Sequence, residues 1–316
     1  MAVFSFTMGE QPADESGPAR RRSSVMAAVA GSLKKQVLLS LKPDLYLDGD
    51  AWHITGPIDF KYFPDTIFPI GNHTPDDSGE DLTKLWLDAW PTVTHSVFAS
   101  LWAGLAFNLA HFTFLETEPG GLIDSNVLPG SDGGLYVGVG PTVVWDNRDN
   151  NLATYRGGRH GLKAIFYHGA LGSAQDFSAF EVDSRHFFQL FGEHVLALQL
   201  LARFKTGDVP AARISKLGGE VMLRGFFAGR FNARHLIATQ AEYRFPIWWR
   251  FRGAAFLGVG RVANRLSRFV LADLKVAGGA GLRYALIPED RANLRLDVGY
   301  TNTGDLNFYF VFAEAF

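Results

Sequence analysis

The sequence of 316 residues lacks cysteine, and it lacks any apolar run long enough for a membrane-spanning helix. Such a helix needs about 18 or more consecutive apolar residues. The most apolar stretches, such as residues 101–115, carry Asn108 and His111 inside them. The net charge is −2, which gives no charge-based case for nucleic-acid binding. These absences leave two classes: a soluble protein, or a membrane protein that crosses the bilayer as a β-barrel.

The N-terminal region also lacks the hydrophobic core of a signal peptide, because residues 10–24 are polar. An exported protein needs such a core. If the chain belongs in a membrane beyond the cytoplasm, we therefore expect the sequence to be a mature fragment, or a reading frame truncated before Met1.

Motifs of known enzyme chemistry are missing as well. The sequence contains no Gly-x-Ser-x-Gly elbow, no phosphate-binding loop and no His-Glu-x-x-His motif. Its nine histidines show no metal-ligand spacing. Loop-borne His73 with Asp76 and Asp77 is the only candidate for catalysis. We therefore expect no enzyme activity, no catalytic residue, no metal and no cofactor.

Alternation of apolar and polar residues is the dominant pattern that is present. Within residues 194–205, Leu196 and Leu198 share one face of an extended strand, and Gln199 and Arg203 take the other. A soluble antiparallel sandwich gives the same alternation. Opposite charges on each polar face, and tryptophans near the turns, favour a barrel with a charged interior. Fifteen such strands are predicted, at residues 2–8, 22–31, 35–47, 51–63, 82–97, 101–115, 134–146, 159–171, 177–190, 194–206, 234–246, 249–263, 269–285, 291–301 and 306–316.

The final segment is unusually aromatic. Phe308, Phe310, Phe312 and Phe316 fall on one side of an extended strand. A core strand of a soluble sandwich is the alternative interpretation, but a closing barrel strand that faces lipid explains the pattern better.

Connections and charges also follow a pattern. Short turns near residues 48–50, 100, 192–193 and 248 alternate with long connections at 64–81, 116–133 and 207–233. Bacterial barrels have short periplasmic turns and longer outer loops. Residues 65–88 hold six acidic residues against one lysine, and residues 203–252 hold ten basic against three acidic residues. Two ordinary solvated faces would give the same counts.

The most specific motif lies in residues 214–232, ISKLGGEVMLRGFFAGRFN. It places a glycine pair ahead of a Leu-Arg-Gly-Phe sequence, at Gly218, Gly219, Leu223, Arg224, Gly225 and Phe226. This resembles the loop signature of the outer-membrane assembly superfamily. That superfamily includes the BamA and TamA insertases, the bacterial surface antigen family and the two-partner secretion transporters.

Further elements match this family in the same order. Residues 242–246 resemble its Glu-x-Arg-Phe-Pro strand, and residues 279–284 with 295–297 resemble its penultimate strands. Residues 146–150 with Gly157 resemble its long periplasmic turn. Residues 63–64 and 71–72 resemble an upstream element of the surface antigen branch. The resemblance spans roughly residues 22–316.

The resemblance implies that the loop folds back into the barrel, where its arginine contacts acidic residues of the wall. Arg224 offers a planar guanidinium that suits carboxylates. Glu242 and Asp297 lie at inward-facing positions and are the candidate partners. The alternative is that Arg224 is an exposed surface cation. Gly258 stands where the family often has an aspartate, so the arginine contact is expected to depend on Glu242 alone or to be weaker.

The prediction is thus an all-β, transmembrane antiparallel barrel, with sixteen strands in the family and about fifteen here, the sixteenth expected before Met1. Residues 1–316 form a single domain without the family's periplasmic polypeptide-transport-associated domains, which argues against a complete insertase. The resemblance implies a protein of the Gram-negative outer membrane that aids protein insertion or translocation. Its partners would be outer-membrane lipid, lipopolysaccharide and client outer-membrane proteins, not nucleic acid. A passive anchor or pore for a separate module, and a soluble β-sandwich, are the alternatives.

Overall fold

The computed structural model describes residues 2–8, 23–75, 77–270 and 272–316, and nearly all of its regular structure is β-strand. Among these residues, no helix has the length and apolar character needed to cross a bilayer. The elements are β1 (Ala2–Met8), β2 (Ser23–Gly31), β3 (Val37–Leu47), β4 (Trp52–Thr55), β5 (Ile58–Ile67), β6 (Glu80–Ala89), β7 (Thr92–Phe98), β8 (Leu101–Glu116), β9 (Gly134–Asp146), β10 (Gly157–Tyr167), η1 (Gly169–Leu171), β11 (Phe177–Phe191), β12 (His194–Gly207), η2 (Ala211–Arg213), β13 (Ser215–Leu217), β14 (Phe231–Ala233), β15 (His235–Trp248), β16 (Phe251–Ala263), η3 (Leu266–Arg268), β17 (Lys275–Ile287), β18 (Ala292–Thr301) and β19 (Leu306–Phe312).

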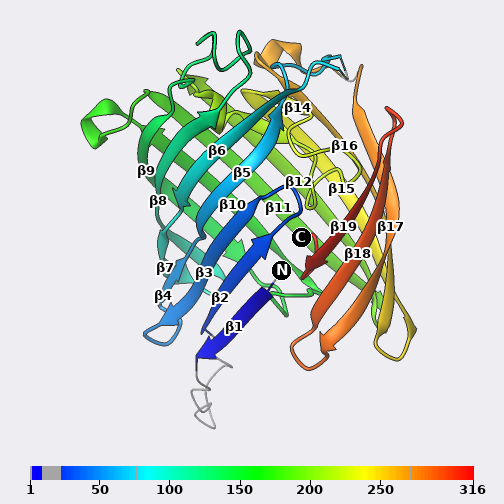
Figure 1. The fold of residues 1–316 in the computed structure, drawn as a ribbon. Coiled ribbons are helices and arrows are strands. Elements are labelled where there is room, and N and C mark those ends of the chain that lie inside the picture. The colour runs from blue at the N-terminus through cyan, green and yellow to red at the C-terminus, as the bar shows by residue number, and fades with distance from the viewer. Residues whose placement is uncertain (1, 9–22, 76, 271) are drawn as a thin grey trace.

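The main sheet is an antiparallel meander that curves into a barrel (Figure 1). β4 and β5 both pair with β3, and β6 and β7 both pair with β8. Between them, β4 pairs with β7 and β5 pairs with β6. β4 and β5 therefore form one interrupted wall strand, and β6 and β7 form the next. Within the described ranges, the seventeen segments of this sheet make fifteen wall strands, which confirms the predicted barrel of about fifteen visible strands. The short hairpin β13–β14 is separate.

The two interruptions occur side by side, at Gly56–Pro57 and Trp90–Pro91. Proline lacks the N–H that a central strand donates to its neighbour. The ladder is bridged locally: the Trp90 N–H donates to the Pro57 carbonyl at 2.9 Å. The prediction that residues 51–63 and 82–97 each form a continuous strand is therefore wrong.

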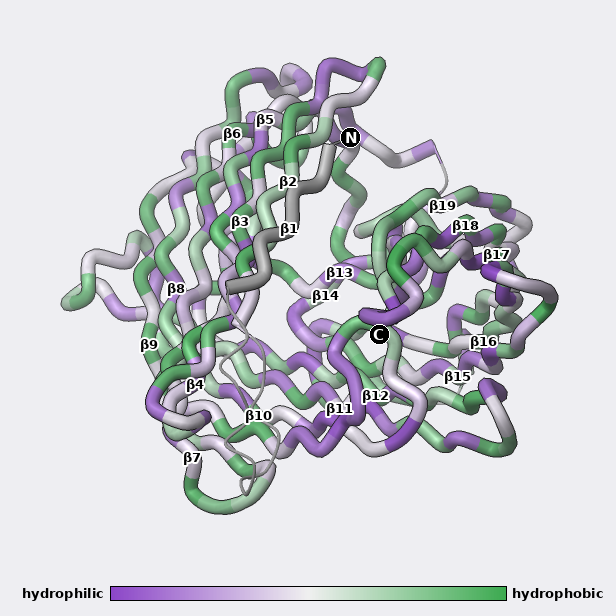
Figure 2. Tube along the Cα trace, turned by 90° about the horizontal axis from the view of Figure 1, so that it is seen from below, coloured by the Kyte–Doolittle hydropathy of each residue, from purple (hydrophilic) through white to green (hydrophobic). Residues whose placement is uncertain are grey.

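The two faces of the wall differ as predicted. On β18, the Leu296 side chain is 46% exposed on the outside, whereas Asp297 is fully buried on the inside. On β12, Leu198 and Leu200 are exposed and Gln199 is buried. Figure 2 looks along the barrel and shows the wall as a ring with β13 and β14 inside it. The soluble sandwich is excluded, because there is one curved sheet rather than two stacked layers.

The barrel is open between its first and last wall strands. Each described wall strand pairs with its neighbours in the chain, but no described residue of β19 has a ladder partner in β1 or β2. Figure 1 shows β19 set apart from β1 and β2, and Figure 2 shows β19 set apart from β2. We call this break between β1 and β19 the seam. Unpaired backbone groups of an edge strand can pair with another chain.

Three predicted boundaries are corrected by the structure. The predicted strand 159–171 ends at Tyr167, after which η1 begins, and the predicted strand 269–285 starts only at Lys275. The predicted closing strand 306–316 ends at Phe312, because Ala313 has a left-handed backbone with φ of 72°. Phe308 and Phe310 are exposed as predicted, but Phe316 turns inward and is only 7% exposed. Its place in the lipid-facing row was therefore wrong.

Candidate functional site

The connection from β12 to β15 folds back inside the barrel and carries η2, β13 and β14 (Figures 1 and 2). We call residues 208–234 the lumen loop. Its sharp turn requires glycine: Gly218 and Gly219 have φ of 95° and 108°, which side chains disfavour. A Cβ at Gly218 would lie 2.6 Å from the Phe227 carbonyl oxygen. The turn is closed by the Gly219 N–H, which donates to the Phe226 carbonyl at 3.1 Å.

An apolar cluster fastens this loop to the inner wall. Leu223 and Phe226 are buried against Leu217, Phe231 and wall residues of β15 to β17. The wall supplies Leu236, Ala238, Val262 and Ala277. Leu217 and Phe226 are fully buried, so the loop side chains fill the interior rather than line an aqueous channel at this level.

Arg224 projects from the turn of the lumen loop onto two carboxylates of the wall. Its side chain is 0% exposed, as are those of Glu242 on β15 and Asp297 on β18. Nη1 donates to Asp297 Oδ2 at 2.6 Å, and Nη2 lies 2.5 Å from Glu242 Oε2. The second contact is an ion pair without an aligned hydrogen bond. The guanidinium carbon also sits 3.6 Å from the Phe256 ring centroid.

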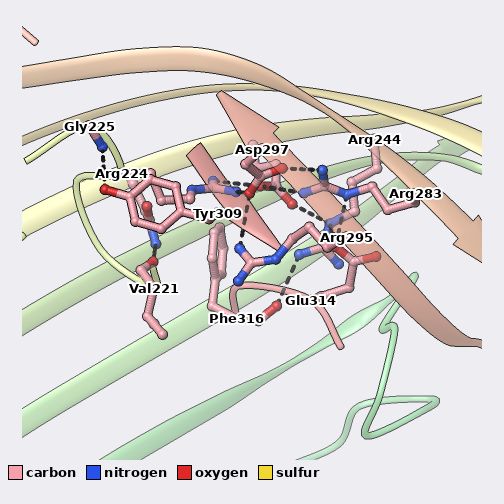
Figure 3. Close-up of polar contacts among 12 residues, drawn as sticks. Val221, Arg224, Gly225, Arg244, Arg283, Arg295, Asp297, Tyr309, Glu314 and Phe316 are labelled. Carbon is pink, nitrogen blue, oxygen red and sulfur yellow. Dashed lines mark hydrogen bonds and ion pairs between the residues drawn. The ribbon is translucent and has the colours of Figure 1, made fainter. Parts of the chain in front are cut away.

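The arginine contact belongs to a larger buried charge network, shown in Figure 3. Arg244, Arg283 and Arg295 bring the arginines to four, facing three carboxylates, Glu242, Asp297 and Glu314. Arg283 pairs with all three, and its contact with Asp297 is the shortest. Arg244 also donates to the Phe316 carbonyl at 3.0 Å. Desolvated charges are tolerated when they are paired in this way, and removing one partner leaves the others uncompensated.

The lumen loop also contacts the strand at the seam. The Gly225 N–H donates to Tyr309 Oη at 3.0 Å, and Asn307 Nδ2 donates to the Gly225 carbonyl at 2.6 Å. Tyr309 donates in turn to the Phe226 carbonyl at 3.1 Å. Only glycine fits here: Gly225 has φ of 127°, and a Cβ would lie 2.9 Å from Thr301 Cγ2. The loop thus grips the inward face of β19.

Comparison with known proteins identifies the family to which this barrel belongs. The model of the Omp85 superfamily domain matches residues 135–316. The chain belongs to the Omp85 superfamily. Both the lumen loop and the strands that hold Arg224 lie inside the matched region, as does β19. No curated protein sequence matches the chain significantly.

The solved structure of a BamA barrel supports the fold of this Omp85 barrel. BamA from Haemophilus ducreyi lacking POTRA domains 1–3 is similar, with a TM-score of 0.62 and 13% identity. The match covers 92% of this chain and 64% of the BamA chain, so this chain spans less than two thirds of the length of that BamA chain. Lower TM-scores relate it to the TodX monoaromatic hydrocarbon channel (0.37, 10% identity, 88% and 78% covered) and to Pseudomonas aeruginosa OpdK (0.35, 14% identity, 91% and 90% covered).

The Omp85 barrel resolves the question raised by Gly258. Gly258 lies on β16 beside Gln240 and Leu223, and a Cβ there would be 3.6 Å from Leu223 Cδ1. The acidic contact of Arg224 is not left to Glu242 alone, because Asp297 shares it. The expectation of dependence on Glu242 alone was therefore wrong, whereas a weaker contact stays a prediction. Tyr309, Asn307 and Glu314 were missed from sequence, although Asn307 and Tyr309 alternate with the phenylalanines of β19 and so had to face inward.

The long turn between β9 and β10 of the barrel has a defined internal structure. Arg148 donates to both oxygens of Asp146, and the Asn147 side chain accepts from the Gly158 N–H at 2.7 Å. Asp149 accepts from the Tyr155 N–H and from Arg291 Nη1, the latter at 2.7 Å. Burial raises the pKa of Asp149, but these hydrogen bonds outweigh it and hold that pKa below its usual range.

The loop histidine His73 is placed beside a different carboxylate among the described residues. His73 lies 3.3 Å from Asp273, and Asp76 lies outside the described residues. Within the described ranges, no cluster of three His, Cys, Asp or Glu side chains could hold a metal.

Proposed function

We propose that this chain acts at the outer membrane of a Gram-negative bacterium, where its barrel aids the insertion or translocation of other proteins. Membership of the Omp85 superfamily and the BamA-like fold support the general class. The observation that carries the proposal is the link between the lumen loop and the seam. Arg224 is held by the wall, and the adjacent Gly225 holds β19, which pairs with β18 on one edge and has no described ladder partner on the other.

The physical basis is strand templating. An edge strand presents a row of unpaired N–H and C=O groups, and an incoming extended segment can pair with them. Pairing at β19 would give a client its first ordered strand while the apolar outer face of that strand meets lipid. The lumen loop would keep the inward face of β19 in position during this step. The proposal assigns no catalytic residue, metal or cofactor to the barrel.

Clients and lipid are the partners that the proposal requires. The client would be an unfolded outer-membrane protein whose strands can pair with β19. The lipid would be that of the outer membrane, including lipopolysaccharide, in contact with exposed side chains such as Leu198, Leu296 and Phe308.

A reconstituted assay tests the proposal. The barrel is placed in liposomes, a urea-unfolded eight-stranded outer-membrane protein is diluted in, and its folding is timed by heat-modifiable migration. We expect faster folding than in liposomes that contain an unrelated closed barrel at the same density. Equal rates, together with ion conductance through the barrel, would instead establish a passive anchor or pore.

A further inference from the structure

A second buried arginine fixes the lumen loop to the opposite side of the barrel. Arg213 closes η2, near the start of the loop, and its side chain is 8% exposed. Nη1 and Nη2 donate to the two oxygens of Asp88 on β6, at 3.0 and 2.7 Å. Nη2 also donates to Asn108 Oδ1 on β8 at 2.7 Å. This two-point geometry is the strong form of an arginine–carboxylate contact.

The surroundings of Arg213 are built to hold it. Asn108 donates to Asp88 at 2.8 Å and accepts from the Tyr167 hydroxyl at 2.9 Å. The Trp90 indole N–H donates to Asp88 at 3.0 Å. The guanidinium also lies 5.2 Å from the Trp90 ring and 5.1 Å from the ring of Phe112. A cation held against aromatic faces in a dry site gains further stabilisation.

The two arginines of the loop therefore grip different walls. Arg213 binds β6 and β8, which belong to the N-terminal side of the seam. Arg224 binds β15 and β18, which belong to the C-terminal side. Eleven positions of chain separate the two residues, and this stretch includes the hairpin strand β13.

Contacts of the connection between β5 and β6 join the same two sides. The loop between β5 and β6 meets β14, where the Gly71 N–H donates to the Asn232 carbonyl at 2.8 Å. Arg230 donates to the Thr74 carbonyl at 2.7 Å. Asn72 donates to the Asp273 carbonyl, beyond β16, at 2.9 Å. The Arg213 contact differs from these crossings because its partners Asp88 and Asn108 lie on the wall strands β6 and β8 rather than on a connecting loop.

We propose that Arg213 is a positioning residue that sets the width of the seam. No ladder between β1 and β19 resists separation of the two sides in the described structure, so apart from the continuous wall opposite the seam, the two sides are joined by contacts across the lumen. The Arg213–Asp88 contact makes the lumen loop a brace between them. The effect of the Arg213–Asp88 contact on client proteins rests on the proposed function, whereas its effect on seam width does not.

A distance measurement across the seam tests this directly. Because the sequence has no cysteine, Leu39→Cys on β3 and Leu296→Cys on β18 accept spin labels without other changes. Both side chains are exposed on the outer face, at 42% and 46%. We expect Arg213→Gln and Asp88→Asn each to lengthen the mean label distance and broaden its distribution. The double variant should give about the same label distance as either single variant, because both substitutions remove the same Arg213–Asp88 contact.

Arg203→Gln is the matched control. Arg203 also lies on the inner face of the wall and is in an ion pair, 2.7 Å from Glu181, but it is 37% exposed and the two residues lie on adjacent strands of one wall. Its loss should leave the distance unchanged. Heat-modifiable migration shows whether each variant is folded before its label distance is measured. If Arg213→Gln does not fold, Asp88→Asn tests the same contact. An unchanged distribution in a folded Arg213 or Asp88 variant would overturn the brace, as would an equal change in Arg203→Gln. The client-folding assay, run separately, reports on the proposed function alone.

Discussion

At the scale of single residues, the sequence was most informative where a motif and strand phase agreed. The family motif indicated Arg224, and the alternation of β15 and β18 placed Glu242 and Asp297 inward. The structure has both contacts. Arg213 and Asp88 could not be paired from sequence, since 125 positions separate them and no motif marks either. The acidic stretch 65–88 and the basic stretch 203–252 were the available signal, and they meet at this contact.

Removing the Arg224 side chain should be strongly destabilising. Arg224→Ala leaves Glu242 and Asp297 buried with one cation fewer, and breaking a buried pair typically costs about 3–5 kcal/mol. The measurement is the urea midpoint of the folded barrel in detergent. Arg203→Ala is the comparison, since Arg203 is 37% exposed and exposed pairs contribute about 0–1 kcal/mol. Similar losses for both variants would contradict the assignment of Arg224 as a buried anchor.

The turn between β9 and β10 should respond to acid through Asp149. The pKa of Asp149 is lowered in the folded protein, so its contribution is complete above the unfolded value of about 3.9 and is lost as pH falls through the folded value. We expect the thermal midpoint to drop below about pH 4, and less so in Asp149→Asn. Identical pH profiles for wild type and Asp149→Asn would show that this hydrogen-bonded turn contributes nothing measurable.

At the scale of elements, period-two alternation predicted where strands lie and which face is outward, because one face meets lipid and the other a charged interior. It missed the interruptions at Gly56–Pro57 and Trp90–Pro91, and the inward turn after Phe312. Those depend on contacts between neighbouring strands or on a single left-handed residue, which alternation does not encode. The phenylalanine row suggested a continuous strand, but Phe316 packs against Phe187 inside the barrel.

The interruption in the fourth wall strand should tolerate no side chain at Gly56. Its φ is 129°, and a Cβ would lie 1.8 Å from the Trp90 carbonyl oxygen, which is backbone of the adjacent strand. We expect Gly56→Ala to fold poorly, read as a reduced heat-modifiable fraction. Gly192→Ala is the control, because Gly192 also has positive φ but no atom lies within 4 Å of its Cβ position. A Gly56→Ala barrel as stable as Gly192→Ala would mean that the two strands can separate at this point.

At the scale of the whole molecule, the chain is an open Omp85 barrel whose interior loop contacts both sides of the seam. The barrel class and its fifteen wall strands followed from alternation, connection lengths and the family resemblance. The open seam did not, because edge pairing depends on how the whole sheet closes. The prediction that residues 1–316 form a single domain remains a prediction.

Photocrosslinking at the seam tests the central claim most directly. A photoreactive phenylalanine analogue at Phe310 of β19 is compared with one at Leu198 of β12, which is also exposed on the outer face but lies on a strand paired on both sides. During folding of an unfolded client in liposomes, we expect crosslinks to the client from position 310 and few from position 198. Equal crosslinking at both positions, or none at 310 while the client folds faster, would contradict a role for β19 as the client-pairing edge.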